Sequence, residues 1–544
     1  MRFDKFKRPF AVLFAAALLM FALCGCTAAN SSAVTQTSQD DMFTDRDYDS
    51  SYDETSAVKI TLADGNIASS SASAVATDGD CATITQEGTY VITGSLSNGK
   101  IVVDADDSAK IQLVLAGVDI NCESSAAIYV KNANKVFITL AEKSENVLSN
   151  SSDFVATDDN NIDSVVFSKS DLSFNGNGSL TVNAAYGHGI VSKDDLVFTA
   201  GAYSITSADH GLQGKNSIRI ANGTFNIKCT EDGLHSENKG DSSKGFVYII
   251  GGTLNISAGD DGIHSGTSLT VKDGKINISE SCEGLEGQSI NISGGTVSVV
   301  SSDDGFNAAS SDSSSARQSD PMAADDNCSI NISGGKITVD ADGDGIDSNG
   351  SITVSGGEIY VAGPESGENG ALDYNGTATV TGGTVIMLGS NKMAQNFGSE
   401  STQGVMLVSF SETTGETSVS DADGKVLASF SSNKKYASAV ISTPDIKHGE
   451  TYTVTAGGET QSIEMSSLVY GENSHQGANE MGKGQPGMPR GENNGGMAPG
   501  SNPSGGGDSS GSGQPPEKPS GSASEVPNEA FGNKASENAS SDAA

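Results

Sequence analysis

The stretch GDDGIHSG (259–266) places two acidic residues before a glycine and an apolar residue directly after it. Closely similar phrases return as EDGLHSE (231–237), SDDGFNA (302–308) and DGDGIDSNG (342–350). In the eight copies that can be aligned, the residue after the central position is always apolar: Ile190, Leu212, Leu234, Ile263, Leu285, Phe306, Ile346 and Leu372. An apolar residue that recurs in register predicts an inward-facing file in a stack of repeats.

A second marker is a glycine turn between short strands, as in SGGTVSV (293–299) and SGGKITV (333–339). Together the two markers give a repeat of about 22 residues with two or three short strands, and no helical periodicity, which excludes leucine-rich and ankyrin repeats. Such a coil buries its apolar residues only by stacking on its neighbours. Residues 56–403 are therefore predicted to form an all-β, parallel β-helix solenoid, with irregular coils over 56–186.

Two repeats are longer than the others, and both gain length just after the acidic motif, at about 237–244 and 308–328. Length changes confined to one position predict loops on one face of the stack, often the binding face. Residues 404–470 show alternating strands with ADGK and GGET turns instead, and predict a small antiparallel β unit. We expect this unit to cap the open end of the solenoid.

The N-terminus has the features of an export signal. Basic residues from Arg2 to Arg8 precede an apolar run that ends in LCGC (23–26). This ending resembles the bacterial lipobox, which implies a signal peptide over 1–25 and lipidation of Cys26; a plain secretory signal is the alternative. We therefore expect an extracytoplasmic protein, anchored by lipid at the cell surface. Residues 26–55 and 471–544 are rich in small polar residues and predict a flexible tether and a disordered tail.

The formal net charge is −38, and tryptophan is absent. This charge disfavours nucleic acid and bare anionic membrane surfaces as partners. An acidic protein that binds an acidic ligand would need a cation between the two. We expect the chain to be a monomer.

Acidic residues around the central glycine stack in register if the coils do. Equivalent positions of adjacent coils lie about 4.8 Å apart, so the carboxylates repel unless they are solvated, protonated or neutralised by cations. Oxygen ligands favour Ca²⁺, whereas the histidines are too scattered among the acids to favour Zn²⁺. The alternative is ordinary Asp-Gly turn chemistry. The candidate metal ligands are Asp209, Glu231, Asp232, Asp260, Asp261, Glu283, Glu286, Asp303, Asp304, Asp342, Asp344 and Asp347.

The repeated DDGIH and SGG phrases, ITQEGTYVITGSLSNGKIVVDA (84–105) and the strands that begin at VMLVSF resemble bacterial carbohydrate-binding-domain-containing surface proteins over about 56–467. The resemblance implies a right-handed, pectate-lyase-like β-helix that binds acidic or cellulose-like polysaccharides with calcium.

These observations favour a non-catalytic, calcium-dependent polysaccharide-binding lipoprotein, with acidic sugars such as polygalacturonate preferred because tryptophan is absent. His235, His264 and Phe306 are candidate ligand-binding residues. A calcium-dependent polyuronate lyase is the first alternative, although no specific basic residue is identified as its catalytic base. A structural stalk or adhesin is the second.

Overall fold

The computed structural model describes residues 42–152, 161–310, 323–365, 367 and 369–474. The predicted all-β class is confirmed: the described residues form strands β1 to β37 and one short helix, α2 (Asp45–Tyr48). Among these residues no helix is both long enough and apolar enough to cross a membrane. The predicted signal peptide, the lipidated Cys26 and most of the predicted tail lie outside the described residues.

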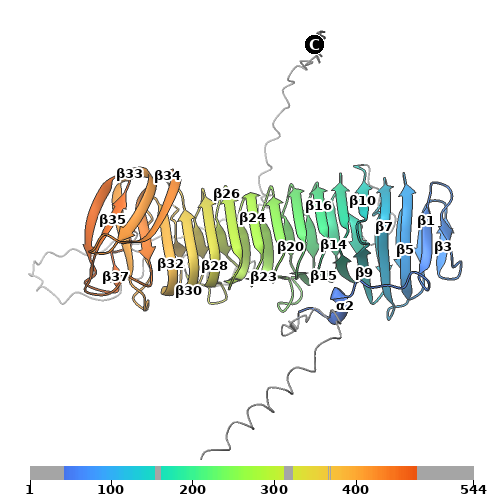
Figure 1. Cartoon of the computed structure of the whole chain (residues 1–544), viewed down its shortest axis with the longest axis horizontal. Coiled ribbons are helices and arrows are strands. Elements are labelled where there is room, and N and C mark those ends of the chain that lie inside the picture. Colours follow the sequence, from blue (N-terminus) through green and yellow to red (C-terminus); the bar gives the residue numbers. More distant parts are fainter. Residues whose placement is uncertain (1–41, 153–160, 311–322, 366, 368, 475–544) are drawn as a thin grey trace, which may run out of the picture. The chain divides into compact units, whose positions relative to one another are not determined.

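Parallel pairing between successive coils dominates the structure (Figure 1). The strand pairs form three parallel series within this pairing network, which we call the first, second and third sheets. The first sheet contains β10 (Glu145–Asn150), β13 (Ser179–Ala184), β16 (Ala202–Ser207), β19 (Thr224–Cys229), β22 (Thr253–Ser257), β24 (Lys275–Glu280) and β26 (Thr296–Ser301). The second contains β8 (Ile128–Asn132), β11 (Ser164–Ser168), β14 (His188–Ser192), β17 (Leu212–Gly214), β20 (Leu234–Ser236), β23 (Ile263–Val271), β25 (Leu285–Ile292), β27 (Phe306–Ala308), β29 (Ile346–Ser348) and β31 (Asp373–Tyr374).

The third sheet contains β9 (Lys135–Leu140), β12 (Asp171–Gly176), β15 (Asp195–Phe198), β18 (Ser217–Ile220) and β21 (Phe246–Ile249), and continues through the second halves of β23 and β25. The long strands β28 (Ser329–Ala341), β30 (Ser351–Ala362) and β32 (Ala378–Gly389) turn a corner and serve both the first and the third sheet. The N-terminal coils use β1 (Val58–Leu62), β2 (Ala68–Ser69), β3 (Val75–Asp78), β4 (Cys81–Ile84), β5 (Gly88–Leu96), β6 (Lys100–Asp104) and β7 (Lys110–Cys122).

The second sheet carries the residues that follow the central glycines, and it stacks them in register, for example Leu234 on Ile263 and Leu285 on Phe306. All eight of these apolar residues are at most 1% exposed. Burying one such side chain stabilises the fold by about 1.5–3 kcal/mol relative to leaving it exposed. One hydrophobic core therefore runs through the coils.

The central glycines are required by the close approach of neighbouring coils. The Gly262 amide donates to the Glu283 carbonyl at 2.9 Å, and a Cβ at Gly262 would lie 2.6 Å from the Gly284 oxygen. No real Cβ tolerates that distance to backbone, so a side chain would force adjacent coils apart. Equivalent contacts occur at Gly284 and Gly305.

The strands after the last coil are antiparallel. β34 (Val426–Ser442) pairs with β32, and β33 (Val405–Ser420), β35 (Thr451–Ala456) and β36 (Glu459–Glu464) extend this sheet, while β37 (Val469–Tyr470) pairs with β33 in parallel. The unit has its own hydrophobic cluster. Because β34 occupies the free edge of β32, that edge is not open to another strand.

Residues 42–55 differ from the flexible tether predicted for 26–55. Asp47 is 2% exposed and its carboxylate lies 2.7 Å from Lys135 Nζ, while Thr199 Oγ1 donates to the Asp47 carbonyl at 2.7 Å. Phe43 is buried against Tyr248 and Val197. A short polar segment is ordered here because specific side chains of the third sheet satisfy its backbone and bury its one apolar ring, which composition alone does not reveal.

Candidate functional site

Two outward-facing columns of polar residues flank the buried file of the second sheet. The pre-glycine column holds the residue before each central position: His188, His210, Asp232, Asp261, Glu283, Asp304, Asp344 and Gly370. From Gly211 onward, the post-glycine column holds the residue two positions after the central one: Gln213, His235, His264, Glu286, Asn307, Asp347 and Asp373, which pair in register from coil to coil. We call the coils from His188 to His264 the histidine segment, and those from Glu283 to Asp373 the carboxylate segment.

The pre-glycine column has a structural task that sequence reasoning missed. Each of several side chains accepts a hydrogen bond from the backbone amide of the next residue in the column. His188 Nδ1 accepts from His210 N–H at 3.1 Å, and Asp232 Oδ1 accepts from Asp261 N–H at 3.0 Å. Aspartate and neutral histidine both place an acceptor atom two bonds beyond Cβ, which explains why both residues occur at this position. The recurrence of aspartate and histidine at six of the eight positions was the available signal.

The histidines form one continuous stack, so the prediction that they are scattered among the acids was wrong. The ring centroids of His188 and His210 are 4.9 Å apart, those of His210 and His235 are 4.3 Å apart, and those of His235 and His264 are 4.8 Å apart. The stack passes from the pre-glycine to the post-glycine column at His235. Residues before and after the glycine share one outward face, and this could be recognised only once the coils were stacked.

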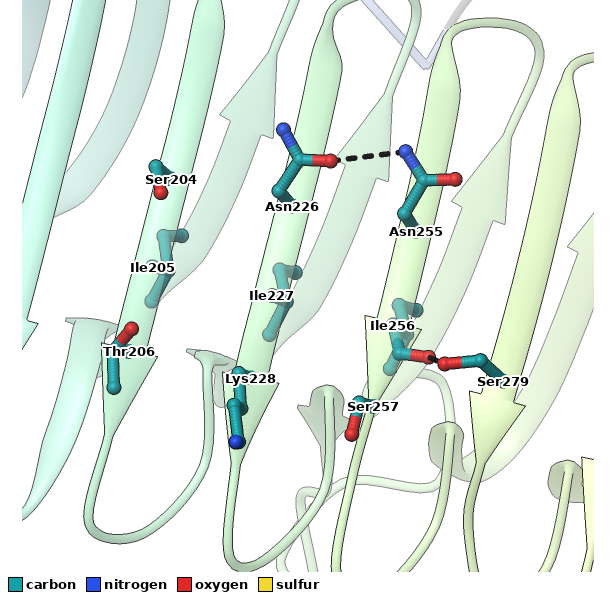
Figure 2. A pocket seen from close by; sticks show the side chains of 10 residues that line it. All are labelled: Ser204, Ile205, Thr206, Asn226, Ile227, Lys228, Asn255, Ile256, Ser257 and Ser279. Carbon is teal, nitrogen blue, oxygen red and sulfur yellow. Dashed lines mark hydrogen bonds between the residues drawn. The ribbon is translucent and has the colours of Figure 1, made fainter. Parts of the chain in front are cut away.

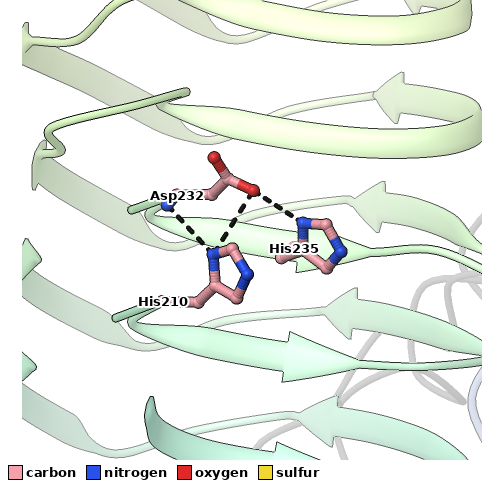
Figure 3. A group of neighbouring side chains, drawn as sticks. All are labelled: His210, Asp232 and His235. Carbon is pink, nitrogen blue, oxygen red and sulfur yellow. Dashed lines mark hydrogen bonds and ion pairs between the residues drawn. The ribbon is translucent and has the colours of Figure 1, made fainter. Parts of the chain in front are cut away.

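The four histidines are of two kinds. His210 Nδ1 accepts the Asp232 amide at 3.1 Å, whereas His235 Nδ1 lies 2.6 Å from Asp232 Oδ2 (Figure 3). Burial, reinforced by the nearby His235, lowers the pKa of His210 to about 3, so this ring is neutral at pH 7.

His264 resembles His235 in its partners, because its Nδ1 lies 3.3 Å from Asp261 Oδ2 and also contacts Glu286 Oε2. Burial lowers the pKa of His264, but the hydrogen bonds to Asp261 and Glu286 outweigh it and raise the pKa to about 10. Burial raises the pKa of Asp261, while for Glu286 burial is outweighed by the hydrogen bond from His264, which lowers the pKa. The imidazolium of His264 therefore neutralises part of the negative charge of Asp261 and Glu286.

Four carboxylates beyond His264 have raised pKa values. Burial, followed by repulsion from Asp261 and Glu286, raises the pKa of Glu283 to about 8. Burial together with neighbouring carboxylates raises the pKa of Asp344 to about 7 and that of Asp347 to about 8. Asp304 is affected in the same way, with a pKa of about 6. Among the described residues, no lysine or arginine forms an ion pair with any of these four carboxylates.

Some predicted ligands converge, and others do not. Asp261, Glu283 and Glu286 bring possible ligand atoms within 4.8 Å of one another, as do His210, Asp232 and His235. Asp304, Asp344 and Asp347 are half-buried in the columns, and among the described residues they belong to no group whose ligand atoms lie this close together. The other predicted acids lie further out: Asp209 is half-buried, and Glu231, Asp260, Asp303 and Asp342 are exposed. Asp342 pairs with Lys434 at 2.8 Å instead of joining the columns. Asp171, Asp194 and Asp195, which the sequence did not indicate, form a further acidic group.

Phe306 was predicted as a ligand-binding residue, and the structure corrects this. Its side chain is 0% exposed and forms one step of the inward file. A buried ring cannot stack on a sugar. The alternation of side chains along the strand, with Phe306 inward and Asn307 outward, is the physical reason.

Two depressions on the coils are candidate binding surfaces. One has a volume of about 280 Å³ and lies beside the 237–244 insertion; it is lined by Asn238, Lys239, Ser242, Gly266, Thr267, Gln288 and Ser310. Gly266 and Gln288 each lie two positions after a post-glycine residue on the same strand, so they face the same side as the columns. The other depression, of about 270 Å³, lies on the first sheet around Asn226, Lys228 and Asn255 (Figure 2).

Comparison with known proteins gives a match to one family over part of the chain. Residues 78–316 match the family described as carbohydrate-binding domain-containing protein. The predicted family resemblance is confirmed. The matched part of this chain, residues 78–316, includes the whole histidine segment and the first carboxylates beyond it. Asp344 and Asp347 lie outside the matched part.

A protein of Acetivibrio thermocellus, described as a carbohydrate-binding domain-containing protein, is 39% identical over 124 residues, which are 22% of this chain and 43% of the relative. The match thus spans less than half of the relative. A solved structure described as a polysaccharide lyase-like protein from C. thermocellum, a gadolinium derivative, is 33% identical and aligns over 44% of this chain and 97% of its own, with a TM-score of 0.40. That TM-score is too low to support a statement about this fold.

Proposed function

We propose that the chain is a surface-anchored, non-catalytic lipoprotein that binds polysaccharide through calcium held in the carboxylate segment. Acidic sugars such as polygalacturonate are the proposed ligands, with cellulose-like glucans as the less favoured class. The family match supports the carbohydrate part of the proposal. The calcium, the acidic sugar and the anchor rest on the residues.

The observation that carries the calcium proposal is the uncompensated charge of Glu283, Asp304, Asp344 and Asp347. Their raised pKa values express the cost of ionising neighbouring, partly buried carboxylates. A bound Ca²⁺ removes this cost, because carboxylate oxygens are its preferred ligands. The histidine segment needs no such ion, since His264 already pairs with Asp261 and Glu286.

The depression beside the 237–244 insertion is the proposed sugar-binding surface. Its amide and hydroxyl groups suit the hydroxyls of a saccharide, and Lys239 offers a cation to a uronate carboxylate. It opens on the face that carries the two columns. Calcium at the carboxylate segment would bridge the protein to further uronate groups along the same chain of sugars.

Two finer features belong to the same proposal. The parallel connections are taken as right-handed, because right-handed crossovers are strongly preferred between parallel strands. Cys26 is taken as the lipidated residue, and mass spectrometry of the membrane fraction tests it. We also expect a monomer, which light scattering tests.

The central experiment measures binding of the chain from residue 27 onward, that is, without the proposed lipid, to polygalacturonate and to a panel of neutral glucans, with Ca²⁺ and with EDTA. We expect polygalacturonate binding that depends on Ca²⁺ and that is lost in the double variant Asp344→Asn/Asp347→Asn. Asp119→Asn, at an exposed position of β7 that pairs with β10 of the first sheet, is the matched control and should bind normally. Binding that is unchanged in EDTA contradicts the calcium proposal. New absorbance from unsaturated sugar ends would replace binding with a lyase activity.

A further inference from the structure

His235 and His264 occupy adjacent steps of the post-glycine column, and their backbones pair directly. Their rings are 4.8 Å apart from centre to centre and within 9° of parallel. Both side chains remain partly accessible, at 17% and 21% exposure. Two imidazoles are therefore presented side by side at the surface of neighbouring coils.

The tautomers of these two rings follow from their partners. Asp232 and Asp261 are hydrogen-bond acceptors when ionised, so each Nδ1 carries its proton toward a carboxylate. Within the described residues, Nε2 of neither ring has a hydrogen-bond partner. A histidine whose Nδ1–H is held by a carboxylate is oriented for metal binding through Nε2.

His188 and His210 differ in this respect. Each uses the Nδ1 lone pair to accept a backbone amide, at 3.1 Å in both cases. Their neutral rings must therefore carry the proton on Nε2, and that edge is a donor. Although His210 also lies near Asp232, it has no free lone pair to offer a cation. The four stacked histidines thus contain two potential nitrogen ligands.

We propose that His235 and His264 form a binding site for a divalent transition metal of the Zn²⁺ class, with Nε2 of each ring as a ligand. Two nitrogens on one tetrahedral Zn²⁺ are about 3.3–3.4 Å apart, since each bond is about 2.0–2.1 Å. The two near-parallel rings, whose centres are 4.8 Å apart, therefore have to turn so that their outer edges converge by roughly 1.5 Å. Where Nε2 of His264 carries a proton, the metal takes its place and the proton leaves to solvent.

Asp232, Asp261 and Glu286 keep the two Nδ1–H groups oriented, and their negative charge compensates the cation. Nitrogen ligands distinguish this site from the all-oxygen calcium site proposed for the carboxylate segment. With two protein ligands, the remaining positions of the metal stay open to water or to oxygen atoms of a bound molecule. The site does not depend on the proposed calcium or sugar binding.

The experiment titrates the chain from residue 27 onward, prepared without a polyhistidine tag, with Co²⁺ as a spectroscopic substitute for Zn²⁺. We expect one equivalent of Co²⁺ to give visible ligand-field absorption, displaced by Zn²⁺ and not by Ca²⁺. The double variant His235→Gln/His264→Gln should lose this absorption. His210→Asn is the matched control, because the amide oxygen still accepts the Asp232 N–H, and it should bind normally.

Three outcomes would overturn the proposal. These are the absence of Co²⁺ absorption in the unmodified chain, its persistence in the double variant, and thiolate-to-cobalt charge-transfer bands that assign the ion to cysteine. Circular dichroism compares the fold of the double variant with the parent. If that variant fails to fold, protection of His235 and His264 from diethyl pyrocarbonate by Zn²⁺ in the unmodified chain decides instead, and its failure contradicts the proposal.

Discussion

The histidine segment and the carboxylate segment occupy the same two columns of one sheet, yet they resolve the problem of stacked polar side chains differently. In the histidine segment, the rings stack at 4.3–4.9 Å and the His264 imidazolium shares its charge with Asp261 and Glu286. In the carboxylate segment, Asp344 and Asp347 repel, and burial raises their pKa values further. One backbone geometry therefore supports an internally compensated surface and an uncompensated one.

The buried apolar residues of the inward file should stabilise the fold in the same way in the histidine segment and in the carboxylate segment. Phe306→Ala in the carboxylate segment should lower the free energy of unfolding by about 3–5 kcal/mol, and Leu234→Ala in the histidine segment by about 2–5 kcal/mol, because each leaves a cavity. Thermal and urea unfolding measure both. Loss of sugar binding by Phe306→Ala without loss of stability would restore Phe306 as a ligand-binding residue.

The central glycines should also act alike in the two segments. Gly262→Ala and Gly305→Ala each place a Cβ within 2.6 Å of backbone oxygen or a buried side chain of the next coil. We expect each to lower the unfolding free energy by about 2–3 kcal/mol through forced separation of coils. Calorimetry tests this, with Gly240→Ala as the control, because a Cβ at Gly240 meets only Asn238 Oδ1 at 3.5 Å. An unchanged melting temperature at either position would contradict the tight stacking.

The two segments should differ in how their contributions to stability depend on pH and on Ca²⁺. The folded pKa of Asp347 is about 8, against an ordinary value of 3.8, so between these values the folded chain binds more protons than the unfolded chain. Without Ca²⁺, the contribution of Asp347 to stability should therefore be largest below about pH 4 and fall as the pH rises toward 8, whereas the lowered pKa of His210 acts in the opposite direction below about pH 6.5. Each pKa unit by which the folded value exceeds the unfolded value corresponds to about 1.4 kcal/mol of unfolding free energy.

Melting curves from pH 4 to 8, with EDTA and with Ca²⁺, measure this dependence. In EDTA, Asp347→Asn should make the melting temperature depend less on pH. His264→Gln should leave most of that pH dependence unchanged. A flat curve for the unmodified chain would show that the carboxylates are not coupled as described.

The smallest difference is expected at the exposed acids two positions before the glycine. Asp303→Asn beside the carboxylate segment should weaken Ca²⁺ binding by about 0.5–1 kcal/mol, because an exposed charge acts through solvent. Asp260→Asn, which lies beside the histidine segment, should change it less. Isothermal titration calorimetry measures Ca²⁺ binding by the two variants. Equal effects would contradict the assignment of Ca²⁺ binding to the carboxylate segment alone.

Much of the fold could be predicted because the spacing of apolar residues and glycines in the repeat indicates which side chains face inward and where each coil turns. The apolar residue after each central glycine predicted the inward file, and all eight members are buried. The order at residues 42–55 could not be predicted, since it depends on Lys135, Thr199 and Tyr248 from the third sheet. Phe306 was assigned to two incompatible roles by the sequence, and only its burial decided between them.

The site was predictable in residue type and only partly in arrangement. By itself the sequence determined which residues share a column, because the repeat fixes the register of identical positions. The tertiary structure decided that the pre-glycine and post-glycine columns meet, that His210 and His235 stack across them, and that one nitrogen of each histidine is already engaged. The physical reason is that the contact between Asp232 and His235 forms within one coil, whereas the contact between His210 and His235 forms only when adjacent coils stack. Hydrogen-bond partners then fix which atom of each ring remains free.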